Sequence, residues 1–435
     1  MISQVLFVLI LVAATFWFTR NLTKIIRNIQ LGRDVNRKDR SSDRWMTMVR
    51  VALGQSKMVV RPVAGIMHIF VYVGFIIINF EVLEIVIDGI FGTHRFFSSL
   101  GPVYNLLIAS FEVLALLVLV GVLVFLARRN ILKLKRFWMK EMTSWPRTDA
   151  NIILITEVLL MTAFLTMNAT DSILQAREFG HYIRAGSFPV STVFAGSFSG
   201  MSSESLEMIE RFCWWFHIVG ILLFLNYIPY SKHFHILLSF PNTYYSNLEA
   251  KGRFTNMESV TREVKLMLDP SAILPPGDPN AVPQRFGAKD VYDLTWKQLM
   301  DAYSCTECGR CSSSCPANQT GKLLSPRKIM MDTRDRLEEV GKNIDRNGKD
   351  FRDEKSLLNY ITEEELWACT SCNACTEACP VNIDPLSIII DMRRYLVMEE
   401  SKVPQELAGM FNKIENNGAP WQFAQADRFN WANAD

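Results

Sequence analysis

The chain has 435 residues, and 49% of them are hydrophobic, which is too apolar for a protein that is soluble throughout. Its formal net charge of +2 says little about partners, because the charges are unevenly distributed along the chain. Eight of the nine cysteines lie in two short clusters, a usage that indicates metal binding and not a disulfide framework. Such clusters are expected to face a reducing compartment.

Five apolar stretches are long enough to cross the roughly 30 Å hydrocarbon core of a bilayer as helices. They are residues 2–18, 63–85, 104–127, 152–168 and 212–240. The first has no basic residue before its apolar run and a basic segment after it. We therefore expect a retained anchor and not a secretory signal.

Lysine and arginine predict the orientation of these segments, because cytoplasmic loops are enriched in both residues. Eleven lie in residues 20–61 and seven in 128–147, against one in 89–103 and two in 170–210. The N-terminus is therefore predicted outside and everything after residue 241 in the cytoplasm, as in a multi-pass protein of a bacterial inner membrane. The basic segment 20–61 directly follows a membrane segment, so we expect it to contact lipid headgroups and not nucleic acid.

A proline-rich segment separates the membrane part from the rest of the chain. Residues 269–284 carry five prolines and are predicted to form a semi-stiff linker or surface loop. The predicted division is a cytochrome b-like membrane domain at 1–240, a cytoplasmic linker at 241–285 and a cytoplasmic domain at 286–435.

The cytoplasmic domain is predicted to be helical. Ser325 is placed to cap a helix that starts at Pro326 and stops at Gly341. Residues 380–400 also predict a helix, and no alternating strand pattern occurs here. The expected fold class is all-α: a five-helix transmembrane bundle followed by an α-helical ferredoxin domain.

The two cysteine clusters share the pattern C-x2-C-x2-C-x3-C-P. Three closely spaced thiolates bind three irons of a [4Fe-4S] cluster, and the fourth cysteine binds the other cluster. Zinc is the alternative, but zinc sites use pairs of CxxC separated by a loop and need no triplet followed by proline. We predict one cluster held by Cys305, Cys308, Cys311 and Cys379, and a second held by Cys369, Cys372, Cys375 and Cys315.

The spacing between the clusters indicates which kind of ferredoxin this is. The 54 positions from Cys315 to Cys369 are too many for a compact ferredoxin made of two short halves. Because the insertion carries a predicted helix, an α-helical dicluster domain fits better. The ninth cysteine, Cys213, is most simply a small buried hydrophobic residue.

His68, His217 and His235 lie in the apolar segments, where liganding residues are functional candidates. His68 and His235 are each five to six residues from the cytoplasmic end of a segment, so they are expected at matching depth, as bis-histidine ligation of haem b requires. A hydrogen-bonded or interfacial histidine pair is the alternative. His217 lies 18 residues before His235, which predicts one helix face with roughly 27 Å between them. A second haem at His217 would need His94 or His181 from the outer loops.

Acidic residues at the outer ends of the segments are candidates for a quinone site, because a quinol loses protons as it loses electrons. Glu81, Glu84 and Asp88 follow one another on the second segment, and Glu112 and Glu157 lie inside the third and fourth. For Glu84 and Asp88 the solvated interface is an equally good explanation. The predicted quinone or proton site is Glu81, Glu112 and His217.

The membrane half resembles a known family of cytochromes. The stretch CWWFHIVGILLFLNYIPYSKHFHILLSF is similar to the gamma subunit of respiratory nitrate reductase, a five-helix dihaem cytochrome b. The resemblance implies that His217 and His235 are the fifth-helix haem ligands and that His68 partners His235. The remaining ligand position of that family falls on Ile78 here, which leaves a second haem without its fourth ligand.

The cytoplasmic half, from RFGAKDVYDLTWKQLMDAYSCTECGRCSSSCPA through IENNGAPW, resembles the ferredoxin portion of heterodisulfide-reductase-like iron-sulfur oxidoreductases. In single-chain members of that family the chain continues into CCG repeats that hold a further cluster. The sequence given stops at Asp435. The resemblance therefore implies a separate CCG-domain partner that docks near the C-terminus.

Together these features predict the electron-transfer subunit of a membrane oxidoreductase. Electrons would pass between the quinone pool, haem b, the two [4Fe-4S] clusters and a cytoplasmic CCG-domain or flavoprotein partner. The flow could run in either direction, because sequence does not set redox potentials. The alternative is a membrane-anchored iron-sulfur scaffold or sensor of an envelope or transport complex, without haem or quinone chemistry.

Overall fold

A computed structural model describes residues 1–271 and 285–433, and the regular secondary structure of these residues is helical. These residues contain no β-strand, only an isolated bridge between Arg33 and Thr295. The all-α prediction is therefore confirmed. Most of the predicted proline-rich linker, residues 272–284, lies outside the described residues.

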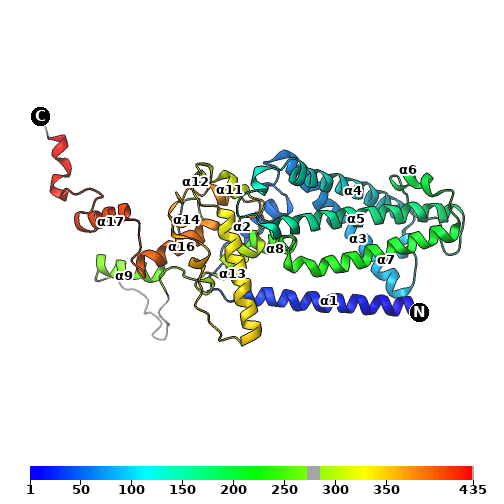
Figure 1. Cartoon of the computed structure of the whole chain (residues 1–435), viewed down its shortest axis with the longest axis horizontal. Coiled ribbons are helices and arrows are strands. Elements are labelled where there is room, and N and C mark those ends of the chain that lie inside the picture. The colour runs from blue at the N-terminus through cyan, green and yellow to red at the C-terminus, as the bar shows by residue number, and fades with distance from the viewer. Residues whose placement is uncertain (272–284, 434–435) are drawn as a thin grey trace.

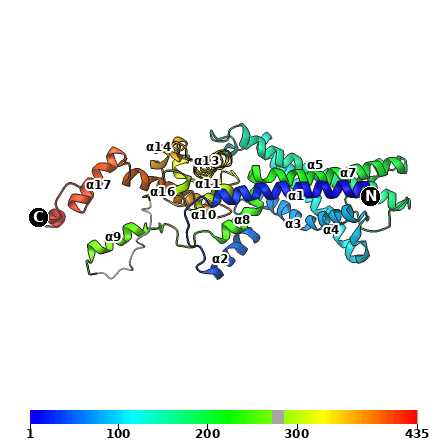
Figure 2. The same ribbon diagram turned by 90° about the horizontal axis from the view of Figure 1, so that it is seen from below.

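Five helices are long and apolar enough to cross a membrane. They lie side by side in both views (Figures 1 and 2) and are α1 (Ile2–Ile29), α3 (Pro62–Phe91), α4 (Pro102–Leu126), α5 (Ser144–Ala176) and α7 (Ser203–Tyr227). Several of them extend beyond the predicted apolar stretch, since their polar terminal turns add to the helix without adding hydropathy. Proline at the first position starts α3 and α4, where a missing N–H costs nothing.

The bundle core lies among α3, α4, α5 and α7. Ile108, Phe111, Phe164 and Ile218 are buried there, whereas most of α1 is exposed on the outside of the bundle. Gly74 of α3 lets α4 approach closely, because a side chain at this position would meet Val118 at 2.4 Å.

The fifth segment is not one helix, which corrects the prediction for residues 212–240. Helix α7 ends at Tyr227, two short 3-10 turns follow (Ile228–Tyr230 and Lys232–Phe234), and α8 (His235–Tyr244) begins a new direction. Pro229 cannot donate a helical hydrogen bond, and Asp149 of α5 accepts from Tyr227 Oη at 2.5 Å and Ser231 Oγ at 2.6 Å. His217 and His235 therefore lie on different helices, and the predicted shared helix face is wrong.

The C-terminal half packs α10 (Trp296–Ser304), α13 (Pro326–Asn347) and α16 (Pro385–Met398) around a core that includes Leu299, Ile329, Leu337, Ile388 and Ile389. Ser325 accepts a hydrogen bond from the Lys328 N–H, so the predicted N-cap is confirmed. The shorter helices of this half are α11 (Arg310–Ser314), α12 (Pro316–Gln319), α14 (Glu363–Trp367), α15 (Ala374–Ala378) and α17 (Gln405–Asn417).

Gly341 does not stop α13 as predicted, because the helix continues to Asn347. Its role is close contact: a side chain at Gly341 would meet Asn28 of α1 at 2.4 Å. In Figure 1, α1 runs from the N-terminus at the far end of the bundle to α13 of the C-terminal half. The first membrane helix thus connects the two halves directly.

The region predicted as linker contains helical structure. The end of α8 lies in it, and α9 (Glu258–Leu268) follows, on the side of the C-terminal half away from the bundle (Figure 1). The remaining elements are α2 (Ser41–Met48), α6 (Ser191–Ala195), π-helical turns at Val49–Leu53 and Ala127–Ile131, and 3-10 turns at Phe96–Leu100, Lys135–Phe137, Gly196–Phe198, Val291–Asp293, Leu357–Asn359 and Gln425–Ala432.

Candidate electron-transfer site

The first cysteine triplet closes around a small cavity together with one cysteine from the second cluster. Cys305, Cys308, Cys311 and Cys379 all line this cavity, with Arg327 and Met330 beside them. Burial raises the pKa of Cys305 to about 11 and that of Cys379 to about 12. Empty of metal, these thiols would stay protonated; iron binding supplies the positive charge that a buried thiolate needs.

The other four cysteines form a neighbouring group. Burial raises the pKa of Cys369 and of Cys375, and the nearby Cys315 and Cys372 add to the effect at Cys369. Cys372 is exposed, in contrast to the buried Cys315 and Cys375. The structure therefore brings the four cysteines of the first predicted set to one cavity and leaves the other four near one another, while the assignment of each thiol to a cluster stays a prediction.

The two cysteine loops have the same backbone conformation. Glu307 and Ser371 sit between the first and second cysteines with φ of +53° and +58°, and Gly309 and Asn373 follow the second with +70° and +60°. This repeated left-handed geometry costs energy at non-glycine residues and is typical of functional loops. In the first loop the three cysteines line one cavity, as a cubane requires, and the second loop repeats the same backbone turn.

His68 of α3 and His235 at the start of α8 face each other at the end of the bundle nearest the C-terminal half. Their ring centres are 6.4 Å apart with an angle of 44° between the rings. Two imidazoles on opposite sides of one metal, at about 2 Å per metal–nitrogen bond, have ring centres roughly 6 Å apart. The pair therefore has the separation that ligation of one iron needs.

The hydrogen bonds of these two rings also suit ligation. His235 Nδ1 lies 3.1 Å from the carbonyl oxygen of Lys232, which orients the ring and leaves Nε2 free. His68 Nδ1 is buried without a hydrogen-bond partner among the described residues. An unpartnered nitrogen at this depth is costly unless something binds it.

His233 is a neighbour that the sequence reasoning missed. Its ring lies 5.5 Å from that of His235 and 5.2 Å from Phe224. The motif His-Phe-His at 233–235 could have indicated this neighbour. Hydropathy alone predicts one continuous apolar helix through these residues. Because the chain forms a 3-10 turn here, His233 and His235 come close to each other.

His217 lies deep in the bundle and is only 1% exposed. Its Nδ1 is 3.0 Å from the Leu160 carbonyl oxygen, and its ring lies 5.8 Å from Phe164. The outer-loop histidines proposed as partners, His94 and His181, contact each other with ring centres 5.2 Å apart. The structure does not bring either of them to His217.

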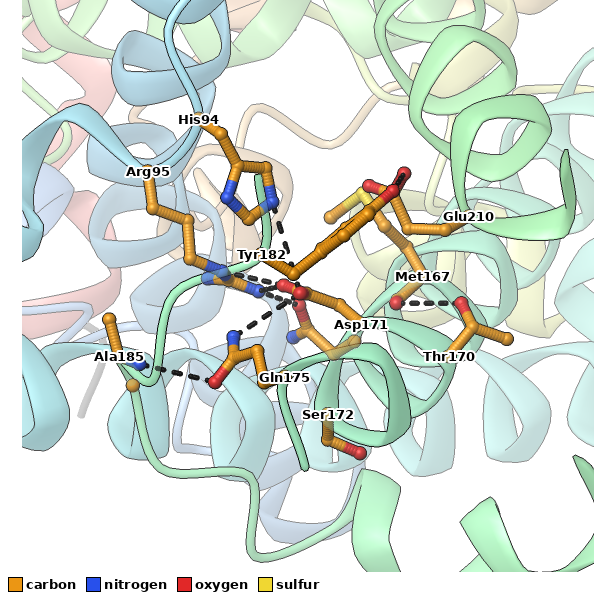
Figure 3. Close-up of polar contacts among 12 residues, drawn as sticks. His94, Arg95, Met167, Thr170, Asp171, Ser172, Gln175, Tyr182, Ala185 and Glu210 are labelled. Atoms are coloured by element: carbon orange, nitrogen blue, oxygen red, sulfur yellow. Dashed lines mark hydrogen bonds and ion pairs between the residues drawn. The ribbon is translucent and has the colours of Figure 1, made fainter. Parts of the chain in front are cut away.

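A buried polar network occupies the end of the bundle opposite the C-terminal half, and Figure 3 shows its polar contacts. Arg95 reaches inward from the α3–α4 loop and donates to Asp171 Oδ2 at 2.6 Å and to Asn168 Oδ1 at 3.0 Å. It also donates to Tyr104, which in turn donates to Glu84 at 2.9 Å. Glu84 is thus a structural member of this network and not a solvated interfacial residue.

The two predicted carboxylates of the quinone site differ in their partners. Glu112 accepts hydrogen bonds from Val190 N–H at 2.9 Å and Ser191 N–H at 3.2 Å and bonds the Ser191 hydroxyl, so it is fully occupied in holding the α5–α7 connection. Glu81 is 3% exposed, and its Oε2 has no partner among the described residues. Of the two, Glu81 has the free oxygen that proton exchange needs.

Cys213 is buried among the apolar residues of the bundle, as predicted. It lies far along the chain from the other eight cysteines. We assign it no role beyond packing.

Comparisons with known proteins agree with the cysteine geometry. Residues 301–383 match the family described as 4Fe-4S dicluster domain. Over 99% of its length the chain is 29% identical to the probable iron-sulfur-binding oxidoreductase FadF of Bacillus subtilis, covering 60% of that protein. Over 92% of its length it is 29% identical to the EtfAB:quinone oxidoreductase of Syntrophomonas wolfei, covering 55% of it.

A shorter likeness links part of the chain to a heterodisulfide reductase polypeptide, as its name describes it. Over 27% of its length the chain is 31% identical to one polypeptide of the ferredoxin/F(420)H(2)-dependent CoB-CoM heterodisulfide reductase of Methanosarcina acetivorans. The match spans 60% of that polypeptide. No solved structure matches the chain.

These matches confirm the predicted likeness to heterodisulfide-reductase-like iron-sulfur oxidoreductases. The C-terminal half contains a 4Fe-4S dicluster domain. The chain spans less than two thirds of the length of FadF and of the quinone oxidoreductase. Their names support electron transfer in general, whereas the likeness to the nitrate reductase gamma subunit stays a prediction.

Proposed function

We propose that this protein is the membrane electron-transfer subunit of a quinone-linked oxidoreductase. The observation that carries the proposal is that two candidate redox sites are neighbours. The His68–His235 pair lies at the end of the bundle that we assign to the cytoplasm, and the cysteine cavity lies in the domain that packs on that end. When bound, a haem b at the histidines and a [4Fe-4S] cluster in each cysteine group would accept and release one electron at a time. The protein's part is to hold and align these groups.

Named residues fit these tasks. His68 and His235 would bind the haem iron from opposite sides, and the Lys232 carbonyl oxygen fixes the orientation of His235. Glu81 would take a proton from a quinol at the outer end of the bundle, with His217 between it and the cytoplasmic pair. The exposed Cys372 puts the second cysteine group nearest to a cytoplasmic partner.

The partner is proposed from the relatives. The name EtfAB:quinone oxidoreductase describes exchange between a flavoprotein and quinone. The chain is also similar to subunits of heterodisulfide reductases, which supports a CCG-domain iron-sulfur subunit or a flavoprotein as the cytoplasmic partner. We place the protein in a bacterial inner membrane with the dicluster domain in the cytoplasm.

Redox-difference visible spectroscopy on the purified full chain tests the proposal, with a soluble quinol as reductant and haem and iron counted on the same sample. We expect a b-type band that quinol reduces, and about eight non-haem irons per chain from two cubanes. Iron without haem would reject the cytochrome assignment and favour the anchored scaffold or sensor. A haem count of two would give His217 a ligand role.

A further inference from the structure

The two cysteine loops share one backbone shape but carry different side chains at matching positions. Between the first and second cysteines stands Glu307 in one loop and Ser371 in the other. Between the second and third stands Arg310 in one and Ala374 in the other. The first loop therefore has long charged side chains where the second has short ones.

Glu307 connects the first loop to the membrane bundle through a buried ion pair. It is 3% exposed and bonds the Lys232 ammonium, with Arg334 of its own domain 2.9 Å away on the other side. Lys232 is buried too, donates to the Pro146 carbonyl oxygen at 2.6 Å and lies 3.7 Å from Asp149. A buried pair of this kind fixes one geometry, because either charge alone would be costly.

The same lysine contacts the histidine pair. Its backbone carbonyl oxygen is the partner of His235 Nδ1, while its ammonium holds Glu307 between Cys305 and Cys308. One residue thus orients a candidate haem ligand with its backbone and a cysteine loop with its side chain.

Arg310 and Arg327 add further contacts between the first loop and the bundle. Arg310 donates to the carbonyl oxygens of Lys57 at 2.9 Å and Met58 at 3.1 Å. Arg327 donates to the carbonyl oxygen of Arg136 at 2.6 Å and that of Glu307 at 3.3 Å. The second loop receives a longer contact, from Lys57 Nζ to the Thr376 carbonyl oxygen at 3.4 Å.

We infer that electrons cross between the bundle and the dicluster domain at the cluster of the first triplet, and that Lys232 and Glu307 are the positioning residues for this step. The inference rests on the proposed function. In the step one electron leaves the centre at His68 and His235 and one arrives at the first cluster, without transfer of a proton or an atom. The second cluster is then the exit, in keeping with its exposed Cys372.

Equilibrium redox titration followed by electron paramagnetic resonance tests the role of Lys232 in the full-length protein. Lys232→Met removes a cation beside Cys305 and Cys308, so reduction of the first cluster becomes about tenfold less favourable, or roughly 59 mV for one electron. The signal of the second cluster is expected to stay in place. Lys232→Arg keeps the charge and should restore the wild-type potential.

Lys297→Met is the matched control, because Lys297 is also buried and paired with a carboxylate, Asp301 at 2.7 Å, but not beside a cysteine loop. It should leave both cluster potentials unchanged even if it destabilises the protein. If Lys232→Met behaves like this control, or moves the second cluster instead of the first, the inference is wrong. If Lys232→Met does not fold, Glu307→Gln is measured in its place: it removes an anion, so the first potential should rise.

A second pair of variants tests the order of the two clusters. Cys308→Ser and Cys372→Ser each replace the middle cysteine of one triplet. The fully reduced protein is mixed with 2,3-dimethyl-1,4-naphthoquinone, and haem oxidation and re-reduction are followed by stopped flow. Rapid re-reduction should survive Cys372→Ser and be lost in Cys308→Ser; the reverse pattern would overturn the proposed order.

These measurements separate the inference from the proposed function. Absence of haem from the wild type would reject the proposed haem, and with it the electron step from His68 and His235. The cluster titration would still show whether Lys232 acts on the first cluster. Normal haem and quinone chemistry with equal effects of Lys232→Met on both clusters would reject only the inference.

Discussion

Cys315 and Cys379 are the cysteines whose roles depend on the fold and not on local spacing. Each follows its own triplet by four residues, yet the cavity at the first triplet contains Cys379 and not Cys315. The N–H of Ile383 lies 3.3 Å from Cys379 Sγ, a contact that stabilises negative charge on sulfur. The prediction that each fourth cysteine binds the cluster of the other triplet can therefore be tested by substituting single residues.

Cys379→Ser is expected to remove or alter the cluster of the first triplet while the second cluster keeps its signal. Iron should fall from about eight to about four per chain if the affected cluster is lost. Cys315→Ser is the matched control, with the opposite pattern expected in electron paramagnetic resonance. If each substitution instead removed the cluster of its own triplet, the exchanged assignment would be wrong.

Glu81 is the side chain on which proton exchange with quinol is expected to depend. Glu81→Gln keeps the size but cannot accept a proton, so the rate of haem reduction by quinol should fall about 100-fold. Reduction by dithionite should be unaffected, because it needs no proton acceptor at this site. Glu204→Gln, at an exposed position on the same side of the protein, is the control and should leave both rates unchanged.

At the scale of elements, α13 is the helix that joins the two halves. The side chain of Asn28 of α1 packs directly against Gly341 of α13. Asn28 also donates a hydrogen bond to Tyr303 Oη at 2.9 Å. Near the end of α13, Asp345 pairs with Lys24 at 2.7 Å and with Arg27. One face of a single helix therefore holds the C-terminal end of the first membrane helix.

Gly341→Val should weaken this contact, because the new side chain meets Asn28 and forces the helices apart. We expect a lower midpoint of thermal unfolding and faster proteolysis in residues 30–40. Gly409→Ala is the matched control: it lies in α17 with no atom within 4 Å of the added carbon, and should be neutral or stabilising by up to about 1 kcal/mol. Equal behaviour of the two variants would argue against the contact.

The pH dependence of the dicluster domain should reflect Arg336 of α13. Arg336 is buried and binds Asp290 at 2.8 Å and Asp353, and its hydrogen bonds hold the pKa of Asp353 below the ordinary value of 3.8. A carboxyl group with a lowered folded-state pKa stabilises the fold above its unfolded pKa. It loses this contribution as the pH falls through the folded value.

The titration of Asp353 should therefore change the midpoint temperature of unfolding little between about pH 7 and 5. At pH values below about 4 the midpoint temperature should fall. Arg336→Met should abolish this part of the drop and cost about 3 kcal/mol at neutral pH. Asp335→Asn, at an exposed neighbour on the same helix, provides the comparison. A variant that keeps the wild-type pH profile would contradict the role of Arg336.

The elements also show how far sequence reasoning reaches. Hydropathy located the five membrane segments, and cysteine spacing anticipated which thiols gather. Hydropathy could not show the break after Tyr227, because Ile228 and Phe234 are as apolar as a helix interior, and the break depends on Asp149 from another helix. For the same reason no local sequence pattern predicts the Arg95–Asp171 network, which joins a loop to a helix distant in sequence.

At the scale of the whole molecule, the N-terminus lies at the end of the bundle opposite the dicluster domain (Figure 1). An odd number of crossings puts the two ends of the chain on different sides of a membrane. The basic residues in 20–61 and 128–147 lie near the dicluster domain, which favours the cytoplasm for that side.

Reporter fusions test this orientation. Alkaline phosphatase, which is active only outside the cytoplasm, should be active when fused before Met1 and inactive after Asp435. Green fluorescent protein should give the opposite pattern. Reversed results for both reporters would place the dicluster domain outside and reject a cytoplasmic electron partner.

The continuity of α1 makes the protein sensitive to its lipids. A helix of 28 residues is about 42 Å long, whereas the hydrocarbon core of a bilayer is roughly 30 Å thick. The C-terminal end of α1 is packed against α13. Thinning or thickening of the bilayer changes the tilt that such a rod adopts. Membrane thickness would then act mechanically on the cytoplasmic domain, so that acyl-chain length becomes a variable for any reconstitution of this protein.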